Sequence, residues 1–78
     1  MHPIKRYRIA RGWTQRELAQ RVGVSVNAVQ AWESGSRIRP GNLARLAEVL
    51  GVDPLRLLNE IEEWRAMRRD RNARDPVS

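Results

Sequence analysis

The apolar residues of this 78-residue chain recur three and four positions apart, in short segments that end at glycines. No run of alternating apolar and polar residues is long enough to predict a strand. The first segment begins at Pro3, which suits the first turn of a helix, and ends at Gly12, which suits a left-handed helix terminus. The pattern therefore predicts an all-α fold.

The second and third predicted helices are joined by a very short connection. Thr14 and Glu17 have the spacing of a capping box, so the second helix is expected to begin at Thr14 and to end at Gly23. Ser25 is the expected cap of the third helix. Helices joined so closely cross steeply, and residues 14–33 are therefore predicted to form a helix-turn-helix. The inward-facing positions of these two helices are Leu18, Ala19, Val22, Val29 and Trp32.

Two further helices are predicted after a basic loop at residues 36–40. The fourth helix ends at Gly51, and Asp53 is placed to cap the fifth. Residues 1–60 are thus predicted to form one domain of five helices, and residues 61–78 a C-terminal helix extension with a basic tail. The apolar faces that complete the core are Leu43, Leu46, Ala47 and Leu50 on the fourth helix and Leu57, Leu58 and Ile61 on the fifth.

The net charge of the chain indicates which class of molecule it binds. The chain has 15 Lys and Arg residues against 9 Asp and Glu residues, which gives a formal net charge of +6, and arginine outnumbers lysine. A polyanion is the expected partner of such a chain, although charge alone does not separate nucleic-acid binding from the composition of an arginine-rich proteome.

The chain contains no cysteine, and its apolar runs are only a few residues long. These two features exclude a disulfide framework, a thiolate metal site and a membrane-spanning helix. Charges near the N-terminus are unlike the apolar stretch of a signal peptide. The sequence therefore predicts a protein that stays in a reducing cytoplasm.

One stretch of the sequence indicates a family. It consists of Gly12, Trp13, Thr14, Gln15, Leu18, Ala19, Gly23, Val24, Ser25, Val29, Trp32, Glu33 and Gly35. At this spacing these residues resemble the XRE family, the Cro and cI type of phage repressor, and the similarity runs from about Ile4 to about Leu58. The resemblance implies a lambda-repressor-like domain that places its third helix in the major groove of double-stranded DNA. It also implies a two-fold dimer that binds a pseudo-palindromic DNA site. The expected location is the cytoplasm, in association with the nucleoid, for a protein of bacterial or phage origin.

The outer face of the third helix has side chains suited to base recognition. Val26, Asn27, Gln30 and Ala31 lie opposite the inward-facing residues. The amides of Asn27 and Gln30 can pair with adenine, and the methyl groups of Val26 and Ala31 can pack on thymine. The family places its base contacts at the matching positions. The alternative is that Asn27 and Gln30 are ordinary solvated side chains, and Asn27 could also bind phosphate.

Phosphate contacts are expected on both sides of this helix. Gln15 follows the cap of the second helix, at the positive end of the helix dipole, and the family uses this glutamine for phosphate. Arg37 and Arg39 in the basic loop are the next expected ligands, together with the backbone N–H groups of Gly41 and Asn42 at the start of the fourth helix. Either arginine could instead serve only solubility.

The resemblance also implies a largely buried ion pair between Arg8 and Glu33, which would fix the third helix without touching DNA. The alternative is two separate surface charges. Trp13 and Trp32 are assigned to packing rather than to base stacking, because the bases of a duplex are already stacked. His2 has no partner at metal-ligand spacing and is expected to be solvated.

The fifth helix carries an apolar stripe longer than so small a domain easily covers. Leu57, Ile61, Trp64 and Met67 are three or four residues apart and share one side of the helix. Either Trp64 and Met67 fold back over the core, or the stripe pairs with a second copy of the chain. We favour a homodimer through these four residues, because one small domain contacts only about half an operator and pairing multiplies affinity.

Together these residues predict a sequence-specific, DNA-binding transcriptional regulator, expected to act as a repressor without a cofactor or a metal. The alternatives are a protein-interaction module on the same fold and an antitoxin that combines DNA binding with toxin binding. A third helix that bound protein would be expected to carry exposed aromatic or large aliphatic anchors. An enzyme is not expected, because the only histidine is terminal and no nucleophile has a plausible base.

Overall fold

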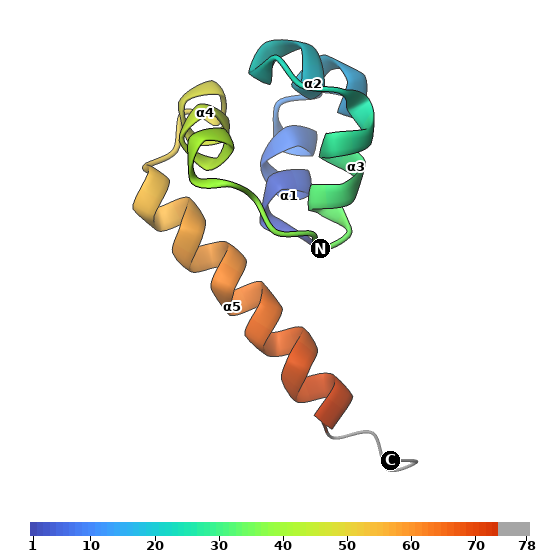
Figure 1. Cartoon of the computed structure of the whole chain (residues 1–78), viewed down its shortest axis with the longest axis vertical. Coiled ribbons are helices and arrows are strands. Elements are labelled where there is room, and N and C mark those ends of the chain that lie inside the picture. Colours follow the sequence, from blue (N-terminus) through green and yellow to red (C-terminus); the bar gives the residue numbers. More distant parts are fainter. Residues whose placement is uncertain (74–78) are drawn as a thin grey trace.

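The computed structural model describes residues 1–73, with side chains as far as Arg68. These residues form five α-helices and no β-strand, which confirms the predicted all-α fold (Figure 1). Residues 74–78, the end of the predicted basic tail, lie outside the described residues. The helices are α1 (Pro3–Ala10), α2 (Gln15–Val22), α3 (Val26–Glu33), α4 (Pro40–Leu50) and α5 (Pro54–Ala73).

The start of α2 is held by the predicted capping box. The Thr14 hydroxyl accepts a hydrogen bond from the backbone N–H of Glu17 over 3.1 Å, and the Glu17 carboxylate accepts one from the N–H of Thr14 over 2.9 Å. The bond from the Thr14 backbone is the main reason that the pKa of Glu17 lies below its usual value. At the other end Gly23 has a φ of 86°, a left-handed conformation that a side chain would disfavour.

Both ends of α3 are closed by local hydrogen bonds. The Ser25 hydroxyl accepts a backbone hydrogen bond from the first turn, as predicted. After the last turn, the N–H of Gly35 donates to the carbonyl of Trp32, and the N–H of Ser36 donates to the carbonyl of Ala31. These two bonds form a Schellman motif in which Gly35, with a φ of 110°, is the left-handed residue. The helix therefore has a defined end.

All five helices contribute to one hydrophobic core, and its members confirm most of the predicted inward faces. Leu43 is half-buried at the edge of this core. The prediction for Leu58 was wrong, because its side chain is 38% exposed. Successive residues of a helix point about 100° apart, so Leu58 turns away from the core that Leu57 enters. The buried hydrophobic residues are Ile4, Leu18, Ala19, Val22, Val29, Trp32, Leu46, Ala47, Leu50, Leu57 and Ile61.

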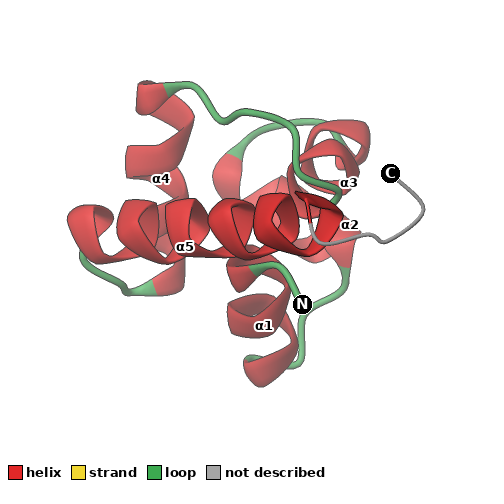
Figure 2. Ribbon diagram, turned by 90° about the horizontal axis from the view of Figure 1, so that it is seen from below, coloured by secondary structure: helices red, strands yellow, loops and turns green. Residues whose placement is uncertain are grey.

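Helix α5 lies across the other helices and extends past them (Figures 1 and 2). Leu57 and Ile61 are buried where α5 crosses the core. Trp64 is half-buried and packs against His2. The structure therefore corrects the prediction that Leu57 and Ile61 contact a second copy, since packing within the domain already covers both. Of the predicted stripe only Met67 is largely exposed, at 65%.

His2 is not solvated, contrary to expectation, and is only 2% exposed. Its Nδ1 accepts a hydrogen bond from the backbone N–H of Ile4 over 3.1 Å, so the imidazole caps the start of α1. The ring packs edge-on against Trp64, with 4.6 Å between the ring centroids. Burial, followed by the nearby charge of Arg65, lowers the pKa of His2 from 6.5 to about 4. The folded protein therefore requires the neutral imidazole, whose Nδ1 is free to accept.

This burial predicts an acid-sensitive stability. The pKa of His2 is lower in the folded chain than in the unfolded chain, so its contribution is present above pH 6.5 and is lost as the pH falls towards about 4. The resulting loss in the free energy of unfolding between pH 7 and pH 5 is about 2 kcal/mol. Urea unfolding at both pH values measures it. Asparagine also caps helices but does not titrate. If His2→Asn loses as much stability as the wild type over this range, His2 is not the responsible group.

Candidate nucleic-acid interface

The outer face of α3 presents three side chains to solvent. Asn27, Gln30 and Ala31 are exposed, while the opposite face is anchored by the buried Val29 and Trp32. The predicted fourth reader, Val26, is half-buried and packs against the core, so it presents less of its surface. This face offers two amides, which can both donate and accept hydrogen bonds, beside a methyl group. It carries no charge of its own.

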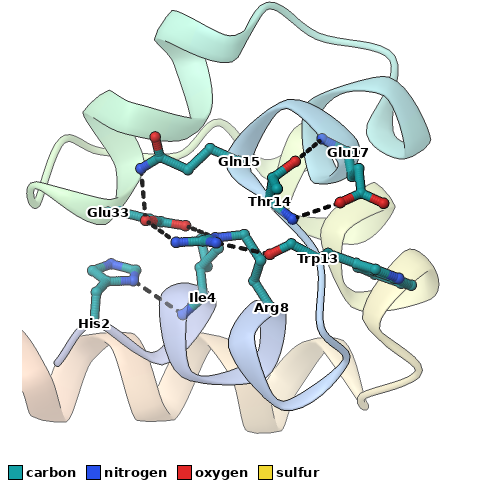
Figure 3. A network of polar contacts seen from close by, with 8 residues as sticks. All are labelled: His2, Ile4, Arg8, Trp13, Thr14, Gln15, Glu17 and Glu33. Atoms are coloured by element: carbon teal, nitrogen blue, oxygen red, sulfur yellow. Dashed lines mark hydrogen bonds and ion pairs between the residues drawn. The ribbon is translucent and has the colours of Figure 1, made fainter.

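The last residue of α3 is tied to α1 by an ion pair between Arg8 and Glu33 (Figure 3). The Arg8 Nε donates to Glu33 Oε2 over 2.7 Å and its Nη2 to Glu33 Oε1 over 3.1 Å, while its Nη1 donates to the carbonyl of Trp13 over 2.8 Å. The two side chains are only 10% and 5% exposed. A guanidinium that bonds both oxygens of a carboxylate fixes their relative orientation as well as their distance.

Gln15 joins the same network from the start of α2. Its Nε2 donates to Glu33 Oε1 over 2.9 Å, and Figure 3 shows the amide reaching across to that carboxylate. A primary amide carries two N–H bonds, so the contact with Glu33 uses one and leaves the other for a ligand. The side chain of Gln15, which is predicted to contact phosphate, is therefore held at the C-terminal end of α3.

The α3–α4 loop begins at this same end of α3 and carries the predicted cationic residues. Arg37 and Arg39 are both exposed. Arg39 is also the N-cap residue of α4, and its side chain makes no capping hydrogen bond. The backbone N–H groups at the start of α4, which include those of Gly41 and Asn42, therefore receive no capping bond from Arg39. Gln15 thus holds a hydrogen-bond donor at the C-terminal end of α3, and the loop and the start of α4 carry further donors directly after α3 in the chain.

A helix-turn-helix family matches residues 4–57 of the chain. The protein belongs to this family, the XRE-type helix-turn-helix. No solved structure matches the chain. Membership confirms the resemblance drawn from the sequence, and it makes the protein a DNA-binding helix-turn-helix regulator. Within the described residues, no helix has the length and apolar content needed to span a membrane.

The matched XRE-type domain ends at Leu57, so most of α5 lies beyond it. Two arginines in that region contact the end of α3, which the sequence did not predict. Arg68 Nη1 donates to the carbonyl of Ser34 over 3.2 Å, and Arg65 Nη2 donates to the carbonyl of Ser36 over 3.0 Å. Their acceptors are backbone carbonyls, which have no side-chain signature, so no pattern in the sequence could have identified the contacts.

Proposed function

We propose that this XRE-type protein is a transcriptional repressor that binds a pseudo-palindromic operator as a homodimer, with α3 in the major groove. The observation that carries the proposal is the uncharged, hydrogen-bonding outer face of α3, with Gln15 bonded to its last residue and the basic α3–α4 loop directly after it. A major groove admits one helix, and base edges are read there by side chains of this kind.

Base recognition is assigned to Asn27 and Gln30, with Ala31 and the exposed edge of Val26 as apolar contacts for thymine. The absence of a large exposed apolar side chain among these four residues favours DNA over a protein partner. A protein-binding helix would rely on buried aromatic or aliphatic anchors.

Affinity is assigned to the flanking groups, because the reading face has no positive charge. The second N–H of Gln15, the guanidinium groups of Arg37 and Arg39, and the backbone N–H groups of Gly41 and Asn42 are the phosphate contacts. Arg8 and Glu33 hold α3 against α1 and orient Gln15, without touching DNA themselves.

A two-fold dimer follows from the size of the reading surface, since one α3 covers one half-site. Because Leu57 and Ile61 are buried, the proposed contact between copies is made by the exposed end of the α5 apolar stripe, at Met67 and the outer edge of Trp64.

Selection of duplexes from a random pool tests this function, followed by binding of Gln30→Ala and Gln15→Ala to the winning sequence. We expect two half-sites related by two-fold symmetry. Gln30→Ala should relax the preference at particular bases, with a loss of about tenfold on the selected sequence. Gln15→Ala should weaken all duplexes alike. Asymmetric selected sites would argue against the dimer, and equal losses on every sequence for both variants would overturn the assigned roles.

A further inference from the structure

The C-terminal end of α3 is contacted by a part of α5 that lies outside the family match. Trp64, Arg65 and Arg68, here called the α5 clasp, surround the turn that follows α3. The Schellman motif uses the N–H groups of Gly35 and Ser36, but no backbone N–H of the described residues donates to the carbonyls of Ser34 and Ser36. Arg68 and Arg65 bond two of those carbonyls, at Ser34 and Ser36.

The clasp also packs directly on the backbone of the turn. A Cβ atom placed on Gly35 would lie 3.3 Å from two ring carbons of Trp64 and 3.1 Å from Arg68 Nη1. The Arg68 guanidinium lies over the Trp64 ring, 4.8 Å from its centroid, and His2 packs on the same ring. Arg68 is therefore held by the Trp64 ring as well as by the carbonyl of Ser34, while Arg65 is held by the carbonyl of Ser36.

The position of the clasp matters because α3 is short. It has eight residues, and its last residue is already fixed to α1 and α2 through Arg8 and Gln15. The clasp fixes the same end through the backbone of Ser34 and Ser36. Arg37 follows Ser36 immediately, so the bond from Arg65 lies at the start of the basic α3–α4 loop.

We propose that Trp64, Arg65 and Arg68 are positioning residues for DNA recognition, which set the direction of α3 and of the α3–α4 loop without contacting DNA. This inference rests on the proposed function of α3 as the base-reading helix. It assigns to α5 a role in sequence selectivity in addition to the contact between copies proposed for Met67 and the outer edge of Trp64. Loss of the clasp should therefore weaken binding to the selected operator by more than the loss of its charge accounts for, while binding to unrelated duplexes changes only as the charge does.

The first test removes the two guanidinium groups with the double variant Arg65→Gln/Arg68→Gln. The matched control is Lys5→Gln/Arg56→Gln, which loses the same charge at two exposed positions. Among the described residues, neither of these side chains forms a hydrogen bond or an ion pair, and the bond from Arg56 to Asp53 comes from its backbone N–H. Affinity is measured on the selected operator and on a scrambled duplex, at a temperature where circular dichroism shows every variant folded. We expect the clasp variant to lose about tenfold more affinity for the operator than the control, with equal affinities for the scrambled duplex.

The variant Arg65→Lys/Arg68→Lys distinguishes positioning from bulk charge, because it keeps both charges but loses the planar guanidinium geometry. A lysine can still donate to a carbonyl, so positioning predicts partial recovery of the lost selectivity, whereas bulk charge alone predicts full recovery. A purely structural role would instead lower the melting temperature and leave the ratio of operator to scrambled affinity unchanged.

A second pair of variants leaves the charge untouched. Gly35→Ala forces a methyl group against Trp64 and Arg68, whereas Gly12→Ala is also made at a positive φ, of 71°, but has no atom within 4 Å of the new Cβ. We expect the operator-to-scrambled ratio to fall for Gly35→Ala and to stay near that of the wild type for Gly12→Ala. Failure of the wild type to select any duplex would overturn the proposed function and this inference together. A selective wild type whose clasp variants match both controls would overturn the inference alone.

Discussion

Replacing Arg8 by alanine is expected to lower the free energy of unfolding by about 3 to 5 kcal/mol. The guanidinium satisfies both oxygens of Glu33 and the carbonyl of Trp13, in a site where the Glu33 side chain is only 5% exposed. Its removal would leave a buried carboxylate with Gln15 as its remaining side-chain donor. Domains are stable by only about 5 to 15 kcal/mol, so much of the protein's stability would be lost. Urea unfolding followed by circular dichroism measures the loss.

The matched control for this prediction is Arg6→Ala. Arg6 also forms an ion pair on α1, with Glu60 at 2.8 Å, but its side chain is 56% exposed. Water screens such an exposed ion pair, so Arg6→Ala should lower the free energy of unfolding by less than about 1 kcal/mol. Similar losses for Arg8→Ala and Arg6→Ala would show that the pair with Glu33 is not effectively buried, and the proposed anchoring of α3 would fail with it.

The second large effect is expected at Leu57, where alanine should cost about 2 to 5 kcal/mol. The side chain is fully buried where α5 crosses the core, so truncation removes its packing and leaves a cavity. Thermal and urea unfolding of Leu57→Ala measure this cost.

Leu58→Ala is the natural comparison, because it makes the same chemical change one position along the same helix. Leu58 is 38% exposed, and its truncation should cost less than about 1 kcal/mol. The change in helix propensity is the same at both positions, so the difference between the variants reports burial. If Leu58→Ala were the more destabilising variant, the rotation of α5 about its axis would differ from that described.

Much of the fold was predictable because its signals are local. The capping box of Thr14 and Glu17, the Ser25 cap and the glycine that ends α2 each involve residues a few positions apart. The apolar spacing of α2 and α3 likewise identified their buried faces, since the period of a helix is a property of the backbone. The family resemblance supplied the expected partner of Arg8, which spacing alone could not have provided.

Three features of the fold were not predictable in this way. His2 was expected to be solvated, but it lies in a space formed by α1 and Trp64 of α5. The apolar pattern placed Leu57 and Leu58 together in the core, although only one of two adjacent helical residues can face it fully. The stripe on α5 looked available to a partner, because periodicity shows that residues share a face without showing what covers it.

Local order in this protein thus follows from the chain itself: where each helix begins and ends, and which face of each is apolar. Caps, turns and helical periods depend on neighbours a few residues away, and these are visible in the sequence. The direction of α5 over the other helices, the burial of His2 and the bonds from Arg65 and Arg68 to the end of α3 arise only in the tertiary structure. Those two bonds join residues 29 and 34 positions apart and end on backbone carbonyls, which every residue has. Long-range packing alone therefore decides which carbonyls are chosen.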